Sequence, residues 1–395
     1  MKHRNESSTE VTDMVVGVFG SDSDWELLSW LSRGLLAVSD SYNSNEMIPY
    51  PLPDPLPRVF HHLAVRQMWK KKHFPTTLLE LWAWAHQPLV KLGLELPPGV
   101  DPAKPLLENG LPTAQCEDLA ELAGKETSPA AQYSSKLMNE VMDLCQTLKA
   151  PHTYVAFRQL LITSPVLTAA ELERCLCDNV LRSLAQQVKK AYLMAPHFAA
   201  RQGYLETCPR CNNLLMPTST QQWVCVDAFC RHRQTGYQKA AKRFPVEKNV
   251  LWLHPGLRRY VAVPGQTEVR LWKRLCQMQI EVELWPDFDA YDLRLVFQDG
   301  EVWAVDVKDW GNPVALAREI NNQRGMRQFP HWNRAFWVFP DHRRMQRPDY
   351  MELFKNNCEY LSATVSAVFE KEFLNLADKK LRQVSRSPHR PVPAT

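Results

Sequence analysis

Asp306 and Lys308 stand two residues apart in the run Val305-Asp306-Val307-Lys308, in which charged side chains alternate with valines. Because side chains alternate along a β-strand, a strand here would place Asp306 and Lys308 on one face and the valines on the other. An acid and a lysine at the end of an apolar strand are costly to bury unless something pairs with them. A divalent metal ion with its bound water would be such a partner, so this run predicts a metal-dependent hydrolytic site.

Asp292 is the acid best placed to join them, because it lies in the strand-like stretch before an Asp-Gly turn. If residues 298–300 form a three-residue loop with Gly300 left-handed, Asp292 lies opposite Asp306, whereas a two-residue turn would place it opposite Val307. We expect the three-residue loop, since that register gathers both carboxylates on one face of the sheet.

Three further acids lie near this constellation in the sequence. Glu268, early in a predicted helix, could reach the site as a further metal ligand or as an acid outside the ligand shell. Asp287 and Asp289 compete with Asp292 for the first position, but a proline breaks the strand before them. Carboxylate oxygens suit Mg²⁺ or Mn²⁺, which neutralises a scissile phosphate and lowers the pKa of a bound water. Lys308 would then stabilise developing charge or orient the attacking water.

Four cysteines form two closely spaced pairs, Cys208-Pro-Arg-Cys211 and Cys225-Val-Asp-Ala-Phe-Cys230. Two such pairs on tight loops suit a tetrahedral zinc ion, whereas redox chemistry would call for a surrounding βαβ pattern. Because four thiolate ligands leave no open position, we expect the zinc to stabilise the fold and not to catalyse. His232 lies close enough in the sequence to replace one ligand.

A local excess of basic residues follows the cysteines. Between residues 231 and 259 eight Lys or Arg residues stand against the single acid Glu247, although the formal net charge of the whole chain is only +4. A nucleic-acid contact and an ordinary solvated face are both compatible with this basic belt. The expected contacts to nucleic acid are basic residues of the belt and one polar residue of a later helix: Arg231, Arg233, Lys242, Arg243, Arg258, Arg259 and Gln323.

The elements that must position these residues can be read from apolar periodicity. The first 200 residues have mainly helical spacing, and the stretch that carries the acids predicts the order α-β-β-β-α-β. We therefore expect a multidomain chain that combines α with α/β structure. Its expected parts are a helical N-terminal region (1–200), a zinc ribbon with the basic belt (201–250), an α/β core (251–350), a C-terminal helical segment (351–381) and a disordered tail (382–395).

Composition excludes several classes of protein. Hydrophobic residues make up 45% and charged residues 23% of the 395 positions, which is ordinary globular composition. There is no apolar run long enough to predict a membrane span, and the N-terminus lacks the pattern of a secretory signal. We therefore expect a cytoplasmic location, in which the ten cysteines stay reduced apart from the metal site.

The element order and the acidic residues together resemble the PD-(D/E)xK restriction-endonuclease-like superfamily, over about residues 264–339. That resemblance implies a restriction-endonuclease-like αβββαβ core. It implies that Asp292 is the first motif acid, that Asp306 and Lys308 form the (D/E)xK half, and that Glu268 is the helix acid found in many members.

A narrower resemblance is carried by four short motifs. They are similar to the REase-like protein encoded beside prokaryotic PIWI-RE (Argonaute-like) proteins. This resemblance implies bacterial defence against phage or plasmid DNA, with DNA or an RNA–DNA hybrid as the nucleic acid, and a PIWI-like protein and a helicase as partners. The motifs are Ile162-Thr-Ser-Pro-Val-Leu-Thr, His254-Pro-Gly-Leu-Arg-Arg-Tyr, Leu284-Trp-Pro-Asp and Val305-Asp-Val-Lys-Asp-Trp.

The sequence thus favours a metal-dependent endonuclease that hydrolyses phosphodiester bonds, with Glu268, Asp292, Asp306 and Lys308 as its catalytic group. Two alternatives stay open. One is a catalytically inactive zinc-ribbon protein that binds DNA or acts as a scaffold in a defence or recombination complex. The other is a transposase or recombination subunit with the same core, which would cut only at defined ends.

Overall fold

The structure is a computed structural model that describes residues 23–43, 51–70, 73–121, 129–232 and 240–386. The chain divides into two compact units, one made of Met1–Pro129 with Met216–Gly236 and the other of Ala130–Leu215 with Tyr237–Thr395. Residues 130–200, which the sequence grouped with the helical N-terminal region, therefore lie in the unit that holds the main sheet. Within the described ranges, no helix has the length and apolar character needed to cross a bilayer.

The first unit packs short helices around a leucine-rich core. On its longest helix, α2, leucines recur three or four residues apart at positions 27, 28, 31 and 35, and all four are fully buried. Helix α4 begins with a capping box in which Thr77 and Glu80 exchange side-chain and backbone hydrogen bonds. The elements are α2 (Ser23–Asn43), α3 (Leu56–Lys70), α4 (Leu78–Ala85), β1 (Leu107–Glu108), β2 (Leu111–Pro112), α5 (Ala114–Glu121), β8 (Trp223–Cys225) and α10 (Ala228–His232).

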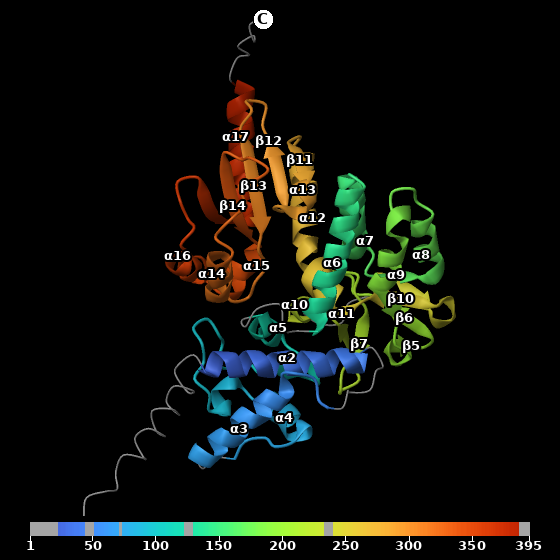
Figure 1. Ribbon diagram of the computed structural model, residues 1–395, viewed down its shortest axis with the longest axis vertical. Coiled ribbons are helices and arrows are strands. Elements are labelled where there is room, and N and C mark those ends of the chain that lie inside the picture. The colour runs from blue at the N-terminus through green and yellow to red at the C-terminus, as the bar shows by residue number, and fades with distance from the viewer. Residues whose placement is uncertain (1–22, 44–50, 71–72, 122–128, 233–239, 387–395) are drawn as a thin grey trace, which may run out of the picture. The chain divides into compact units, whose positions relative to one another are not determined.

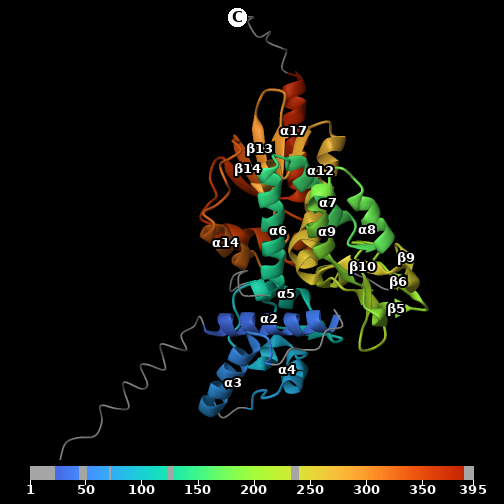
Figure 2. The ribbon, with the colours of Figure 1, turned by 45° about the vertical axis from the view of Figure 1, so that its right-hand side comes forward.

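The second unit begins with helices and short strands. Helices α6 and α7 lie side by side (Figures 1 and 2), and both contribute to the largest hydrophobic core of the chain. The elements are α6 (Pro129–Thr147), α7 (Pro151–Thr163), β3 (Val166–Thr168), α8 (Ala169–Leu176), α9 (Ala185–Ala191), β4 (Tyr192–Met194), β5 (Ala200–Arg201), β6 (Tyr204–Glu206), β9 (Arg243–Pro245), β10 (Val250–Leu253) and α11 (Pro255–Leu257). Strands β3, β10 and β4 form one small sheet, and β5, β6 and β9 form another.

The main sheet of this unit has five strands in the order β11-β12-β13-β14-β15. The first three strands run antiparallel, and β13, β14 and β15 run parallel. Figure 1 shows these strands and their helices in orange and red. The elements are α12 (Val263–Gln277), β11 (Glu281–Leu284), α13 (Pro286–Asp289), β12 (Leu293–Val296), β13 (Val302–Val307), α14 (Pro313–Asn322), β14 (Arg334–Phe339), α15 (Asp341–Gln346), α16 (Tyr350–Asn357), β15 (Val365–Phe369) and α17 (Glu370–Arg386).

Helices cover both faces of this sheet. Val305 and Val307 pack in the same core as residues of α12 and α17, whereas Val302 and Ala304 pack in a core with α14 and α16. Because residues alternate along β13, Asp306 belongs to the face that α14 and α16 cover, as the alternation of the sequence predicts.

The predicted order α-β-β-β-α-β is present as α12, β11, β12, β13, α14 and β14, with the short turn α13 between β11 and β12. Two expectations are wrong. Residues 351–381 are not helical throughout, because Val365–Phe369 form the edge strand β15. Gln323, expected on a later helix, follows the last residue of α14, Asn322.

Candidate active site

The hairpin of β12 and β13 sets Asp292 opposite Asp306. The pairing of Leu293 with Val305 is the last pair of the register between the two strands, and the same register extended by one residue pairs Asp292 with Asp306. Gly300 has a φ of 83°, the left-handed conformation expected of it in a three-residue loop. The predicted register is therefore present, and the alternative two-residue turn is not formed.

Asp292 is tied to the strand that carries the other two residues. Its Oδ2 atom accepts a hydrogen bond from the backbone N–H of Val307 at 2.6 Å, and its side chain is buried. Lys308 Nζ lies 2.9 Å from Asp306 Oδ1, and these two side chains keep 25% and 19% of their surface exposed. The strand end therefore presents one buried carboxylate beside a partly accessible acid and ammonium group.

Glu268 approaches from α12, but its carboxylate is already held. Glu268 Oε2 accepts a hydrogen bond from Trp285 Nε1 at 2.6 Å and pairs with Arg158 Nη2 at 3.0 Å. Helix α12 lies close to α7 at Gly265, where a Cβ atom would lie 2.3 Å from the Cδ1 atom of Ile162, so that side chain would have to shift. Glu268 is therefore a buried carboxylate beside the site, with two donors on its Oε2 atom.

Clustered negative charge shapes the electrostatics. The pKa of Asp292 is raised well above its ordinary value by burial and by the neighbouring carboxylates of Glu268 and Asp306, which Lys308 partly offsets. Burial also raises the pKa of Glu268, against the opposing effect of Arg158. Burial lowers the pKa of Lys308, but Asp306 and Asp292 outweigh it and raise that pKa overall. Lys308 is therefore a cation and not a general base.

The competing acids Asp287 and Asp289 lie in the turn between β11 and β12, and Asp289 is close enough to contribute to the raised pKa values of Glu268 and Asp292. Asp289 forms an ion pair with Arg158 and accepts a hydrogen bond from Tyr154 at 3.4 Å. Trp285, at the start of this turn, donates its backbone N–H to the carbonyl of Asp292 at 2.8 Å. Asp292, and not Asp287 or Asp289, is thus the acid that bonds to the main chain of β13, at Val307.

The two cysteine pairs of the sequence form one cluster. Cys208, Cys211, Cys225 and Cys230 are all buried, and their sulfur atoms lie within 4.8 Å of one another. A zinc ion with Zn–S bonds of about 2.3 Å needs sulfur atoms roughly 4 Å apart in a tetrahedron. The donor set therefore fits zinc, and the strand β8, Trp223–Cys225, leads into the second pair.

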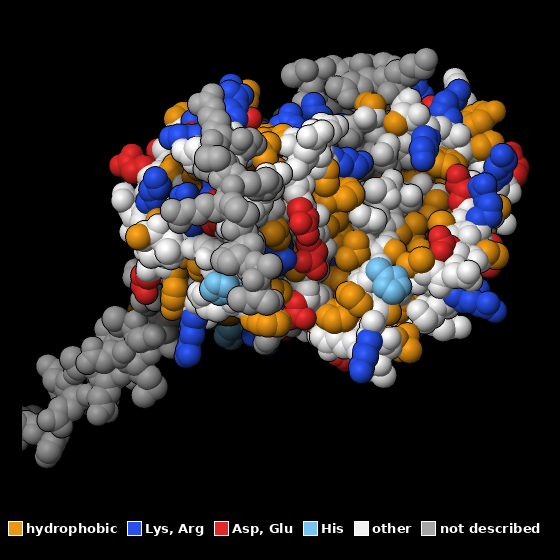
Figure 3. All heavy atoms as spheres, turned by 90° about the horizontal axis from the view of Figure 1, so that it is seen from above, with side chains coloured by type: hydrophobic (Ala, Val, Ile, Leu, Met, Phe, Trp, Pro, Cys, Tyr) orange, Lys and Arg blue, Asp and Glu red, His pale blue; other side chains and the backbone are white. Residues whose placement is uncertain are grey.

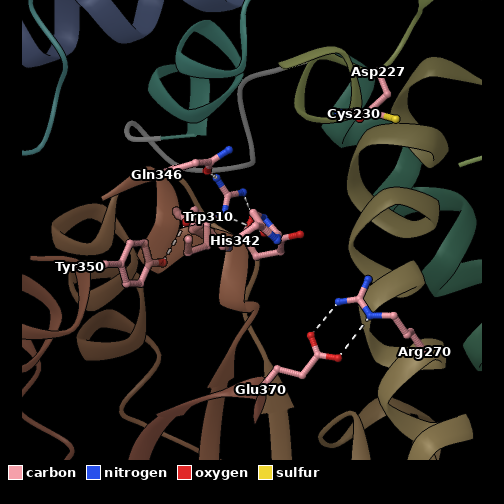
Figure 4. Close-up of polar contacts among 10 residues, drawn as sticks. Asp227, Cys230, Arg270, Trp310, His342, Gln346, Tyr350 and Glu370 are labelled. Carbon is pink, nitrogen blue, oxygen red and sulfur yellow. Dashed lines mark hydrogen bonds and ion pairs between the residues drawn. The ribbon is translucent and has the colours of Figure 1, made fainter. Parts of the chain in front are cut away.

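Backbone hydrogen bonds shape both cysteine loops. Cys208 donates its N–H to the carbonyl of Asn213 at 2.8 Å, and Asp227 Oδ1 accepts the N–H of Cys230 at 2.7 Å (Figure 4). The side chain of His232, the alternative ligand, lies outside the described residues. In the described part of the chain, the four cysteines are the one group of three or more Cys, His, Asp or Glu residues whose ligand atoms lie close enough to hold a metal. Glu268, Asp292 and Asp306 do not form such a group.

The basic belt is not a continuous exposed surface. Arg258 and Arg259 lie in a π-helical turn, Arg258–Ala262, and are only 3% and 7% exposed. Arg231 donates to the backbone carbonyls of Cys225 and Val226. These three side chains therefore pack or form hydrogen bonds within the fold. The excess of basic residues in the sequence could not show this, because it does not reveal which side chains are buried.

The remaining members of the predicted contact set differ in their surroundings. Arg243 pairs with Glu206 at 3.0 Å and keeps half of its surface exposed, and Lys242 is exposed. Gln323 is exposed at the end of α14. Arg233 lies outside the described residues. Figure 3 shows one face of the molecule, on which the described Lys and Arg side chains are dispersed among other side chains.

Two arginine clusters near the strand ends were not anticipated. Arg343 of α15 donates hydrogen bonds to the side-chain carboxylate of Asp309 at 2.7 Å and to the backbone carbonyl of Asp309 at 2.6 Å. Asp309 is the residue directly after Lys308. Arg270 of α12 reaches both carboxylate oxygens of Glu370, as Figure 4 shows. Such pairs join residues far apart in the chain, so no local signal could have found them.

Arg158 was also missed, although its helix carried a signal. It lies four residues after Tyr154 and three before Leu161, both of which are buried, so helical spacing places it on the inner face of α7. An arginine on a buried helix face needs anionic partners.

Comparisons with known families agree with this geometry. Residues 265–385, which include the five-stranded sheet, match the family model described as "REase associating with pPIWI_RE". Residues 27–168 match the model described as "pPIWI_RE three-gene island domain Y". Together the two matches identify the chain as a pPIWI_RE-associated REase-like protein, as its short motifs predict. No curated protein and no solved structure matches the chain.

Proposed function

We propose that the chain is a metal-dependent nuclease that hydrolyses phosphodiester bonds of DNA within a PIWI-associated defence module. The observation that carries the proposal is the position of Asp292 opposite Asp306 at a strand end, with Lys308 Nζ 2.9 Å from Asp306 Oδ1. The matches to the pPIWI_RE-associated REase and to domain Y support the setting and a PIWI-like partner.

The carboxylates of Asp292 and Asp306 would hold Mg²⁺ or Mn²⁺. Their fit to a divalent cation is supported by the crowding of negative charge, which raises the pKa of Asp292 and which a cation would relieve. When bound, such an ion supplies charge neutralisation at the phosphate and a water of lowered pKa. Glu268 would act from outside the ligand pair, because Trp285 and Arg158 already occupy its Oε2 atom.

Lys308 would stabilise the charge that develops on the phosphate. Its pKa is raised by Asp306 and Asp292, so it carries a positive charge throughout the physiological pH range. An ammonium group fixed at the site favours the more highly charged transition state over the substrate. The four cysteines would hold a structural zinc ion and take no part in this chemistry.

The test is cleavage by the purified full-length chain with Mg²⁺ or Mn²⁺, on single-stranded DNA, duplex DNA and RNA–DNA hybrid, with and without the PIWI-like partner. Asp306→Asn and Lys308→Met should each lower the rate about 100-fold or more.

Matched controls come from the other end of the same hairpin. Lys380 pairs with Asp299 and Glu301 there, so Asp299→Asn and Lys380→Met remove an acid and a lysine that also face each other. Both variants should cleave like the wild type. Cleavage that survives Asp306→Asn would contradict the proposal.

The second candidate is an inactive scaffold that binds DNA. The observation in its favour is that Glu268, Asp292 and Asp306 do not form a three-ligand metal group among the described residues. Binding of DNA without cleavage, in either metal and with the partner present, would decide for the scaffold.

A further inference from the structure

Arg158 is at the centre of a buried cluster beside the candidate site. Its Nη2 atom lies 3.0 Å from Glu268 Oε2, its Nη1 atom pairs with Asp289, and its guanidinium stacks over the ring of Trp285 with 4.2 Å to the centroid. The Arg158 side chain is 7% exposed. Arg158 therefore contacts α12 through Glu268, and it contacts both ends of the turn between β11 and β12 through Trp285 and Asp289.

We infer that Arg158 is a positioning residue of the nuclease site, which fixes the carboxylate of Glu268 and the turn that leads into Asp292. The inference rests on the proposed function. It adds a residue from α7, which lies outside the stretch matched by the REase model and inside the stretch matched by domain Y.

The first argument is charge. Four carboxylates, those of Glu268, Asp289, Asp292 and Asp306, share this region with two cations, Arg158 and Lys308. The excess is two negative charges, which one divalent cation would balance. Without Arg158 the excess would be three, and Glu268 and Asp289 would repel each other without a shared partner.

The second argument is the backbone of the turn. Trp285, Asp287, Phe288 and Asp289 have φ values of 49°, 47°, 55° and 75°, in the left-handed region that L-residues rarely adopt. Each such residue costs about 1–2 kcal/mol, so the turn persists only when its surroundings hold it. Arg158 provides that restraint, because it binds the side chains at both ends of the turn.

The third argument is the link to Asp292. The backbone N–H of Trp285 donates to the carbonyl of Asp292 at 2.8 Å, and the indole of Trp285 donates to Glu268. A displaced Arg158 would free Trp285, and this displacement would reach Asp292 through one hydrogen bond. Buried ion pairs are seldom built for stability alone, since their desolvation is costly.

The test measures the dissociation constant for Mn²⁺, with the electron paramagnetic resonance signal of the free ion as the readout of binding. Cleavage and thermal unfolding are measured on the same variants. Arg158→Met and Glu268→Gln should each weaken Mn²⁺ binding by about 10- to 100-fold, as removal of groups behind metal ligands typically does. If Arg158 acts through Glu268, the double variant should bind no more weakly than the worse single variant.

The matched control is Arg66→Met. Arg66 pairs with Asp24 in the other unit and is buried to a similar degree, at 8% exposure. Its loss should lower the unfolding temperature and leave Mn²⁺ binding unchanged. Arg158→Lys carries the test if Arg158→Met does not fold, because lysine keeps the charge but cannot serve two carboxylates in the same geometry. It should weaken Mn²⁺ binding several-fold, about 3- to 10-fold.

The outcomes separate the two proposals. A wild type that binds Mn²⁺ and cleaves, beside an Arg158→Met variant that does both equally well, overturns the inference alone. Effects that multiply in the double variant overturn the part of the inference in which Arg158 acts through Glu268. A wild type that neither binds Mn²⁺ nor cleaves overturns the proposed function, and the inference with it.

Discussion

The carboxylate of Asp292 accepts the backbone N–H of Val307 at 2.6 Å, so the first acid of the site is fastened to the strand that bears the second acid and the lysine. Val307 stands between Asp306 and Lys308, and its side chain packs in the core under α12 and α17. The carboxylate of Asp292 is therefore held by the main chain of β13, between the two residues that it is proposed to act with.

Asp292→Asn should separate stability from activity. The amide oxygen of asparagine can still accept the N–H of Val307, and the substitution removes a buried negative charge, so the unfolding temperature should stay unchanged or rise. Mn²⁺ binding and cleavage should be lost. Asp292→Ala, which leaves that N–H unpaired, should destabilise the fold by about 1–3 kcal/mol. Calorimetry of both variants checks this, and equal destabilisation by both would contradict the hydrogen-bond argument.

Stability of the metal-free protein should depend on pH through Asp292. Its folded-state pKa is raised by burial and by Glu268 and Asp306, so the native state binds a proton more tightly than the unfolded state does. Between the ordinary value of about 4 and the raised value, stability should therefore fall as pH rises. The difference in unfolding free energy between wild type and Asp292→Asn, followed from pH 4 to 8, isolates this group.

Added Mn²⁺ gives the complementary result. Binding favours the ionised carboxylates, so the metal should stabilise the wild type more at pH 8 than at pH 5, whereas Asp292→Asn should respond little at either pH. A metal effect that is the same at both pH values would argue against Asp292 as a ligand.

The sequence predicted the hairpin but not what packs against it. The register of Asp292 and Asp306 followed from Gly300, because a local turn determines which residues face each other. The strand Val365–Phe369 was read as helix, since it follows a helix and its alternation is short. The left-handed turn at Trp285–Asp289 had no signal at all, because non-glycine residues adopt it only under restraint from distant residues such as Arg158.

Burial of charge was equally hard to foresee. Arg258 and Arg259 counted toward an exposed belt in the sequence, yet tertiary packing buries both. Glu268 was expected to be a ligand or an outer acid, and the partner that decides between these roles, Arg158, lies 110 residues earlier in the chain. Such pairings are set by the approach of α7 to α12, which no local pattern encodes.

The cysteine cluster should hold one zinc ion per chain, measurable by plasma mass spectrometry of the purified protein. Cys208→Ser and Cys225→Ser should each reduce the zinc content and lower the unfolding temperature by at least about 5 °C, because the thiolate-bound ion contributes to folding. Cys276→Ser is the control, since that cysteine is exposed and lies outside the cluster. Full zinc content in Cys225→Ser would contradict the four-cysteine site.

Arg343 should hold the end of β13. Its guanidinium binds the side chain and the carbonyl of Asp309, the residue directly after Lys308, and Arg343 is only 3% exposed. Arg343→Met should destabilise the protein by about 3 kcal/mol, because it takes a buried guanidinium away from the Asp309 carboxylate, which His342 also contacts at 2.9 Å. Cleavage should fall by about 10- to 100-fold, since a displaced strand end moves Lys308 away from the phosphate.

The control for Arg343 is its neighbour Arg344, which pairs with Glu372 and keeps half of its surface exposed. Arg344→Met should change stability by no more than about 1 kcal/mol and leave cleavage unchanged. Denaturant unfolding and single-turnover cleavage, measured on both variants, separate a general loss of stability from a local displacement. If Arg343→Met cleaves at the wild-type rate well below its unfolding midpoint, then Lys308 is positioned by β13 itself, and Asp309 has no part in holding the site.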